Sequence, residues 1–403
     1  MGGKHYISLS EELQERIRED RKHHVENPFA CSEDAIVRRN PDRDKATLWR
    51  PGYVRDCEKI MHTPYYNRYQ DKTQVFSLYK NDDITRRSVH VQLVSRIARN
   101  IGKALNLNLD LIEAISLGHD IGHTPFGHAV ENKLSEIYHG RTGKYFNHNI
   151  QSARILDEIF SVNLSLQTLD GIICHNGEME LEKYQPRAYT DFAAFDEKMQ
   201  DCMVNKDGVK KLVPNTLEAC VMRVADIIAY LGKDRQDARK LGLIESDDCF
   251  GDLGIGTINA EIINNMSVHI IERSYGKPYI SMDSNFYKAF SQGKKENYQK
   301  IYRHDSNTKV FDEQIYPMLE ELYNRLLKDY TEVKKSSPIF THHIDYINSH
   351  IGNYGKRYET EKYSADDIVV DYIASMTDDY FVDVFDYLFP GNRYRINYIG
   401  YFD

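Results

Sequence analysis

Helical periodicity of apolar residues runs through most of this 403-residue chain and limits the folds that it can adopt. Between residues 84 and 105, apolar side chains recur every four residues, at Val89, Leu93, Ile97, Ile101 and Leu105. This spacing predicts a helix with one apolar face, for which Thr85 is the expected N-cap residue. The alternating pattern of β-strands is nearly absent. We therefore predict an all-α fold.

The same periodicity predicts helices in other parts of the chain. They cover residues 9–24, 110–119, 126–138, 148–160, 216–240, 257–274, 310–331, 339–350 and 365–388. The segment 110–119 is apolar on nearly all sides, so we expect it at the centre of the core. The only strands that we expect are short ribbons near residues 208–214 and 393–402.

The length of the chain permits one large domain or two ordinary ones. We expect an N-terminal helix with an extended arm (1–50), a core (51–240) and a helical C-terminal part packed on the core (241–403). Within the core, residues 177–214 are mixed in charge, and we expect an irregular excursion there. The arm at 25–50 fits an interface or substrate-covering segment and a wrapped surface loop equally well.

Composition favours a soluble, cytoplasmic enzyme. No stretch approaches the roughly 20 apolar residues of a membrane span, and the N-terminus lacks the apolar run of a secretory signal. Six scattered cysteines without a CxxC pair predict reduced thiols rather than disulfides or a zinc site. The net charge of −9 argues against a nucleic-acid coat but leaves room for a local basic pocket that binds phosphate.

The segment AISLGHDIGHTPFGHAVE (114–131) concentrates ionisable residues at the end of an apolar helix. It contains His119, Asp120, His123, His128 and Glu131. Burying such groups is costly unless they are paired or bound to a metal. A single histidine in this setting is often a hydrogen-bonded core residue, but five ionisable residues in one window favour a metal or catalytic site.

Two further residues on other predicted helices complete a metal-ligand set. His90 lies on the apolar helix 84–105, and Asp226 lies within the apolar run CVMRVADIIAYL. With His119 and Asp120 they supply two nitrogen and two oxygen ligands, which suit six-coordinate manganese, iron or magnesium better than structural zinc. For Asp226 alone, a buried salt bridge to an arginine is the alternative.

His128 and Glu131 are three residues apart, on one face of the predicted helix 126–138. A histidine held by a carboxylate suits general acid or base catalysis, because its pKa lies close to the working pH. The alternative for this pair is an ordinary surface contact.

These motifs resemble the HD superfamily of metal-dependent phosphohydrolases, and within it the deoxyguanosine triphosphate triphosphohydrolase-like branch. The superfamily pattern H…HD…D corresponds to His90, His119-Asp120 and Asp226. The branch is matched by HDIGHTPFGHAVE and, in order along the chain, by YNRYQDKTQVF (66–76), TRRSVH (85–90), TLEACVMRVADIIAYLGKDRQDA (216–238) and VVDYIASMTDDY (369–380). The matches span roughly residues 50–390.

The resemblance implies an HD-domain helical bundle with additional C-terminal helices, and a role for each matched position. The metal ligands are His90, His119, Asp120 and Asp226. The catalytic residues are His128, Glu131 and His148, with His123 lining the phosphate path. The substrate contacts are Arg87 on phosphate, Tyr230 and Asp234 on the sugar, Gln74 on the base or sugar, and Arg68 in the same upstream block.

The resemblance also implies hydrolysis of deoxynucleoside triphosphates (dNTPs) to deoxynucleoside and tripolyphosphate. The expected cofactor is Mn²⁺ or Mg²⁺, with Fe²⁺ as a further candidate, and the expected assembly is a homo-oligomer, from dimer to hexamer. An allosteric dNTP and single-stranded nucleic acid are partners that relatives suggest, although nucleic acid is not predicted as the main ligand. Another HD-type nucleotide phosphohydrolase, or a nucleotide sensor without turnover, is the alternative function.

The sequence departs from the branch at Ile227, where some relatives carry a basic phosphate-binding residue. Another cation must then contact the outer phosphates. The candidates are Lys233, Arg235, Lys277 and Arg303.

Overall fold

The computed structural model describes residues 5–175, 181–302, 309–350 and 358–402. It confirms the all-α fold. The only sheet in these ranges pairs two short antiparallel strands, β1 (Lys183–Tyr184) and β2 (Ile280–Ser281). The α-helices are α1 (Glu11–Lys22), α2 (Gly52–His62), α3 (Arg87–Ala104), α4 (Leu109–Gly118), α5 (Gly127–Thr142), α6 (His148–Arg154), α7 (Leu166–Ile173), α8 (Phe192–Val204), α9 (Leu217–Lys240), α10 (Asn259–Ser274), α11 (Ser284–Asn297), α13 (Tyr316–Thr331), α14 (Asp345–His350), α15 (Ala365–Ser375) and α16 (Asp378–Leu388).

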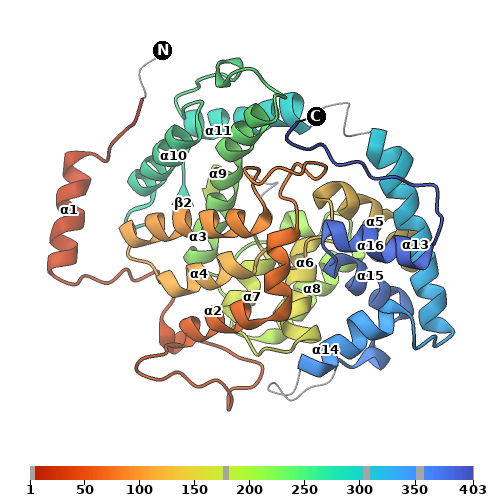
Figure 1. Cartoon of the computed structure of the whole chain (residues 1–403). Coiled ribbons are helices and arrows are strands. Elements are labelled where there is room, and N and C mark those ends of the chain that lie inside the picture. The colour runs from red at the N-terminus through yellow and green to blue at the C-terminus, as the bar shows by residue number, and fades with distance from the viewer. Residues whose placement is uncertain (1–4, 176–180, 303–308, 351–357, 403) are drawn as a thin grey trace.

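Three helices form the centre of the molecule. α3 packs against α4 and α9, while α2 covers α4 and α10 covers α9 (Figure 1). Leu111, Ile112 and Ile115 of α4 are completely buried, which confirms that this apolar segment lies in the core. Since these helices carry the predicted metal ligands, the site is built into the core rather than onto its surface.

The buried face of α3 differs from the predicted stripe. His90, Val94, Ile97 and Ile101 are buried, whereas Val89 is 45% exposed. An α-helix turns about 100° per residue, so positions spaced by four drift by about 40° at each step. A strict four-residue stripe therefore leaves the core at one end, and His90 takes the inward position that we expected for its neighbour.

Helix ends show further differences. Thr85 is not the N-cap of α3: Arg86 occupies that position, and the backbone N–H of Thr85 donates to the Asp237 carboxylate at 3.0 Å. The predicted helix 365–388 is two helices, because Thr377 is extended and caps α16 by accepting from the N–H of Tyr380. Three predicted helices contain π-helical turns, namely Ile155–Ile159, Phe311–Ile315 and Ile339–Ile344.

The predicted ribbons are wrong. Residues 208–214 contain only a 3₁₀ turn at Val209–Lys211, and in 393–402 a single bridge joins Ile399 to Tyr79. A short alternating segment forms no strand unless a neighbouring strand completes its hydrogen bonds. The segment 177–214 is not irregular throughout, since it contains α8. α2, α7 and α11 are also helices that the sequence patterns did not predict.

The C-terminal helices pack against the core from one side. α13 contacts α15 and α5, and α15 contacts α6, on the right of Figure 1. α5 begins within the segment 114–131 and α6 follows it, so the C-terminal helices support the elements that carry the predicted catalytic histidines. Among the described helices, none is both long and apolar enough to cross a membrane.

Candidate metal and catalytic site

The four predicted metal ligands lie together, and we call them the ligand cluster. His90 comes from α3, His119 and Asp120 follow α4, and Asp226 comes from the middle of α9. The Asp226 Oδ1 atom lies 3.0 Å from His90 Nε2 and 3.8 Å from His119 Nε2. The Asp120 Oδ1 atom lies 3.6 Å from His119 Nε2. All four side chains are buried.

The ligand cluster fits a divalent cation. His119 Nδ1 donates to the carbonyl of Ser116 at 2.7 Å, so its Nε2 atom carries a lone pair. This buried Nε2 has no hydrogen-bond partner in the described part of the chain. Leaving a buried nitrogen unsatisfied costs about 1–3 kcal/mol, whereas coordination to a cation would satisfy it. Two imidazoles and two carboxylates suit manganese, magnesium or iron.

Arg87 holds Asp120 from the first turn of α3. Its guanidinium is buried, donates to the Asp120 carboxylate, and also donates to the carbonyls of Thr73 at 2.9 Å and Gln74 at 3.3 Å. Burial raises the pKa of Asp120, but His119 and Arg87 more than offset it and leave the pKa well below its usual value. Asp120 is therefore an anion that can bind a cation.

Asp226 is the second anion of the ligand cluster. Burial raises its pKa, but the hydrogen bond from His90 and the nearby His119 outweigh burial and lower the pKa below its usual value. Among the described residues, the alternative for Asp226, a buried salt bridge to an arginine, is not present; the ionic neighbours of Asp226 there are the imidazoles of His90 and His119.

The predicted catalytic residues form a second group, the histidine cluster, which consists of His123, His128, Glu131 and His148. Glu131 Oε2 lies 2.8 Å from His128 Nδ1. The other carboxylate oxygen accepts from both the backbone N–H and the Nδ1 of His148, each at 2.8 Å. His123 stacks on His148 with 4.5 Å between ring centres.

The charges of the histidine cluster are unequal. Burial opposes a charge on His148, but Glu131 outweighs burial and raises the pKa of His148 to about 9. The pKa of Glu131 is well below its usual value, because the neighbouring histidines overcome the effect of burial. Burial, with Arg87, holds the pKa of His123 well below its usual value, so His123 is neutral. The His128 side chain is 57% exposed and open to a ligand.

The two clusters meet at Asp120 and His148, where His148 Nε2 lies 3.8 Å from Asp120 Oδ1. A further residue, His175, lies at the same place and was missed in the sequence. Its Nε2 atom is 3.0 Å from His148 Nε2 and 3.8 Å from Asp120 Oδ1. The signal that could have found His175 is the one that identified His119, a histidine at the end of an apolar helix; His175 follows Cys174, the C-cap residue of α7.

The turn between α4 and α5 is fixed by close contact with α6. Gly122 donates its N–H to Ser152 Oγ at 2.9 Å, and that hydroxyl donates to the carbonyl of His119 at 2.6 Å. A Cβ atom on Gly122 would lie 2.3 Å from the backbone nitrogen of Ser152. Only glycine therefore allows the HD turn to approach α6 this closely.

The start of α5 is held by the C-terminal part of the chain. Phe126 and Gly127 have φ values of 55° and 66°, a left-handed pair that directly precedes His128. The Phe126 N–H donates to Asp378 Oδ1 at 2.9 Å. Buried Lys72 donates to the carbonyls of His123 and, at 2.9 Å, Ala374. The strained turn thus depends on residues more than 200 positions away in sequence.

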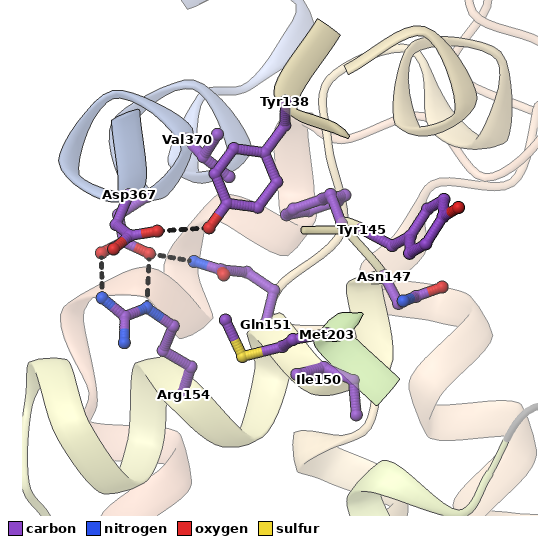
Figure 2. Close-up of a pocket in the computed structure, with 11 residues that line it drawn as sticks. Tyr138, Tyr145, Asn147, Ile150, Gln151, Arg154, Met203, Asp367 and Val370 are labelled. Atoms are coloured by element: carbon purple, nitrogen blue, oxygen red, sulfur yellow. Dashed lines mark hydrogen bonds and ion pairs between the residues drawn. The ribbon is translucent and has the colours of Figure 1, made fainter. Parts of the chain in front are cut away.

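α6 is attached to α15 in a similar way (Figure 2). Asp371 accepts from Arg154 through both carboxylate oxygens, each at 2.8 Å, and from Gln151 at 2.9 Å. The cavity beside these residues measures about 20 Å³, which is roughly the space of one water molecule. It is a packing gap rather than a substrate pocket, and the ion pair positions α6 and hence His148.

The predicted substrate contacts are only partly brought together. Asp234 is buried on α9, two turns after Asp226, and accepts from the Tyr302 hydroxyl at 2.5 Å. Burial raises the pKa of Asp234 to about 7. Tyr230 lies between them on the same helix and is half-buried. Gln74 follows Thr73 beside Arg87, and its buried Oε1 has no partner among the residues that are described.

Arg68 contacts Tyr65 and Ser375. Its guanidinium lies over the Tyr65 ring, 3.8 Å from the ring centre, and donates to the carbonyl of Ser375 at 2.5 Å. Of the basic residues left open for the outer phosphates, Lys233 pairs with Asp237 at 3.0 Å. Arg303 lies outside the described residues.

Comparison with known proteins agrees with this geometry. The sequence model of the HD domain matches residues 87–231, a range that contains the whole ligand cluster. A deoxyguanosinetriphosphate triphosphohydrolase-like protein of Caldanaerobacter subterraneus subsp. tengcongensis is 30% identical over 370 residues, which are 90% of this chain and 92% of that protein.

Two further relatives carry the same description. The protein from Clostridium perfringens (strain SM101 / Type A) is 30% identical over 360 residues, 85% of this chain and 89% of the relative. The protein from Desulfatibacillum aliphaticivorans is 36% identical over 226 residues, 55% of this chain and 56% of the relative. The chain therefore belongs to the family of deoxyguanosinetriphosphate triphosphohydrolase-like HD-domain proteins.

Proposed function

We propose that this protein hydrolyses deoxynucleoside triphosphates to deoxynucleoside and tripolyphosphate. The observation that carries the proposal is the junction of the two clusters, where His148 of the histidine cluster lies 3.8 Å from Asp120 of the ligand cluster. A cation site and an acid–base group are thereby within reach of one phosphate group. The printed names of the relatives, which refer to deoxyguanosine triphosphate, support the substrate class.

In this proposal, His90, His119, Asp120 and Asp226 hold Mn²⁺, Mg²⁺ or Fe²⁺. When bound, such a cation acts as a Lewis acid on a phosphoryl oxygen. Because all four side chains are buried, they exclude water from the side of the cation that faces the protein core.

The histidine cluster moves the protons of the reaction. Water attacks the α-phosphorus, the bond from phosphorus to the 5′-oxygen breaks, and the 5′-oxygen leaves with a proton. Glu131 holds one ring nitrogen each of His128 and His148. The opposite ring nitrogen of His128 is available for proton exchange, and that of His148 faces His175. His123 is buried and neutral, and it lines the path of the phosphates without adding charge.

Residues on α3, on α9 and in the segment before α3 recognise the nucleotide. Arg87 places a permanent positive charge beside Asp120, where it neutralises phosphate oxygens. Tyr230 and Asp234 meet the sugar, with the Asp234 carboxylate as acceptor for a hydroxyl, and Gln74 meets the base or sugar. Arg68, whose guanidinium donates to the carbonyl of Ser375 and lies over the Tyr65 ring, stays a predicted substrate contact. The cytoplasmic location, the homo-oligomer and an allosteric dNTP site stay predictions.

The test is product analysis with each of the four dNTPs and Mn²⁺ or Mg²⁺, resolved by chromatography. The proposal predicts deoxynucleoside and tripolyphosphate in equal amounts from wild-type protein, and neither product from Asp226→Ala. Release of a nucleoside monophosphate or of free phosphate would instead assign the protein to another HD-type chemistry. The absence of turnover with every dNTP and with dNTP mixtures would favour a nucleotide sensor.

A further inference from the structure

The segment from Thr73 to Arg86 forms a loop whose two ends lie side by side at the start of α3. An antiparallel bridge joins Thr73 to Arg86, and the N–H of Arg87 donates to the carbonyl of Lys72 at 3.1 Å. Next to this bridge, the carbonyl of Gln74 accepts from the Arg87 guanidinium at 3.3 Å. The buried Oε1 atom of Gln74 has no partner among the described residues. The loop therefore carries one predicted nucleotide contact, Gln74, and holds another, Arg87.

The apolar side chains of this 73–86 loop pack outside the main core. They belong to a second, small hydrophobic cluster. The buried members of this cluster are Phe76, Tyr79, Ile84, Ala238, Phe250 and Ile301. At the end of α9, Asp237 accepts from the N–H of Thr85 at 3.0 Å, and Lys240 donates to the carbonyl of Asp83 at 2.8 Å. Since hydrophobic stabilisation scales with the apolar area buried, a cluster of this size holds the loop less firmly than the main core would.

The residues that follow α16, 389–402, form a C-terminal tail that reaches the loop. The tail, dark blue in Figure 1, runs from α16 over the upper part of the molecule to the end marked C. Near its start, the N–H of Arg395 donates to the side chain of Gln314 at 3.1 Å, and the Tyr394 hydroxyl donates to Glu321 of α13 at 2.7 Å. The tail is therefore attached to the C-terminal helices before it meets the loop.

Two residues of the tail bind the backbone of the loop. Ile399 donates its N–H to the carbonyl of Leu78 and accepts from the N–H of Lys80, both at 2.8 Å. The Tyr401 hydroxyl accepts from the N–H of Asp82 at 2.7 Å. Ile399 and Tyr401 are 40% and 56% exposed, so they add little to the apolar core. The tail thus acts on the position of the loop through hydrogen bonds rather than on the core through burial.

We propose that Ile399 and Tyr401 are positioning residues for nucleotide binding, which hold the 73–86 loop so that Gln74 faces the nucleotide beside Arg87. The inference rests on the proposed function, since it takes Gln74 and Arg87 as nucleotide contacts. Within the described part of the chain, the hydrogen bonds of both tail residues reach the loop and neither the ligand cluster nor the histidine cluster. The tail should therefore control the affinity for nucleotide and leave the chemical step and cation binding unchanged.

The test compares full-length wild type with the double variant Ile399→Pro/Tyr401→Phe, which removes one N–H donor and one hydroxyl acceptor. Hydrogen–deuterium exchange measures the order of the loop, and kinetics with dGTP and Mn²⁺ measure KM and kcat. We expect faster exchange in residues 73–86 and a roughly tenfold higher KM, because each hydrogen bond contributes a factor of about 2–10 to the population of the binding-competent loop. The kcat value and the Mn²⁺ content should equal those of wild type.

The matched control is Asn397→Pro/Tyr387→Phe, which places the same two replacement residues at exposed positions in the tail and on α16. This control should behave like wild type in every measurement. Should the first variant not fold, Tyr401→Phe alone removes only the contact with Asp82 and is measured in the same way, with a smaller rise in KM expected.

Wild-type exchange in the loop of the folded double variant would overturn the inference, and so would a lower kcat at unchanged KM. A lower melting temperature with unchanged KM and unchanged loop exchange would give the tail a purely structural role and would also overturn it.

The proposed function fails separately, if wild type releases no product from any dNTP. Calorimetric binding of dGTP then replaces KM as the measure of affinity. Faster loop exchange with weaker dGTP binding in the double variant would still support the inference, whereas dGTP binding of equal strength in both proteins would overturn it.

Discussion

The ligand cluster and the histidine cluster touch at Asp120 and His148, yet the chain builds them in different ways. The ligand cluster lies on α3, on the end of α4 and on α9, which are regular helices packed together at the centre of the fold. His90 and Asp226 take inward positions that helical geometry provides, and His119 and Asp120 lie in the turn directly after α4. Its construction is therefore local to the core.

The histidine cluster depends on irregular and distant features. His128 follows a left-handed pair at Phe126 and Gly127, and His148 starts a short helix that continues as a π-helical turn. Asp378 holds the first of these elements and Asp371 the second. We infer that changes in the C-terminal helices will disturb proton transfer while cation binding persists, and the predictions below test this difference.

The largest effect is expected from Asp226→Ala, which removes a carboxylate from the ligand cluster. Both cation binding and dNTP turnover should be lost, with a rate decrease of at least about 10³-fold, equivalent to about 4 kcal/mol. Metal content and tripolyphosphate release are measured on the same preparation. Lys240→Ala, on the exposed end of the same helix, is the control, and retention of metal by Asp226→Ala would contradict the assignment.

Glu131→Gln tests the histidine cluster alone. Because Glu131 holds both His128 and His148, its loss should lower kcat by roughly 10²–10⁴-fold. The cation of the ligand cluster should still bind with unchanged affinity. Glu136→Gln, an exposed glutamate on the same helix, serves as control. If Glu131→Gln lost the cation of the ligand cluster in step with turnover, the two clusters would not be separable.

Asp234→Asn tests the charge on α9, next to the ligand cluster. Burial raises the pKa of Asp234 to about 7 in the folded chain, so the folded state holds this proton more tightly than the unfolded state. The free energy of unfolding therefore falls as the pH rises from the usual pKa of an aspartate to about 7. Above pH 7 the full decrease in this free energy applies. In metal-free protein at pH 8, the variant should be more stable by up to roughly 4 kcal/mol.

The measurement for Asp234→Asn is denaturant unfolding after chelation, repeated between pH 5 and pH 8. The advantage of the variant over wild type should shrink as the pH falls. Asp383→Asn, an exposed aspartate on α16, should show no such trend. A stability difference that does not vary with pH would show that Asp234 carries no raised pKa.

Asp378→Ala has the smallest expected effect and breaks the contact between α16 and the turn before His128. The N–H of Phe126 and the Thr73 hydroxyl lose their acceptor, which should lower the free energy of unfolding by about 1–3 kcal/mol. Turnover should fall while Mn²⁺ content is unchanged, and Asp383→Ala is the matched control. If Mn²⁺ were lost in step with turnover, the contrast between the two clusters would be wrong.

The same contrast explains how much the sequence could predict. The all-α fold and the central helix α4 follow from periodicity, and ionisable residues in apolar runs single out His90, His119, Asp120 and Asp226 as candidates. The pairing of His128 with Glu131 follows from their spacing. These are properties of single helices, and a sequence contains them directly.

What the sequence did not predict depends on contacts between distant segments. His175 joins the site only because α7 packs beside α4 and α6. The break at Thr377, which lets Asp378 reach Phe126, interrupts an apolar pattern that is continuous in sequence. The contact of Arg68 with the carbonyl of Ser375 likewise depends on α15.

The central claim is that this protein cleaves the bond between the α-phosphorus and the 5′-oxygen of a dNTP. Hydrolysis in ¹⁸O-labelled water, followed by mass spectrometry of the products, tests it most directly. Attack of water on the α-phosphorus with loss of the 5′-oxygen predicts label in tripolyphosphate, none in the deoxynucleoside, and no reaction in chelator-treated protein. Label in a nucleoside monophosphate or in free phosphate would show that another bond is broken and would contradict the account.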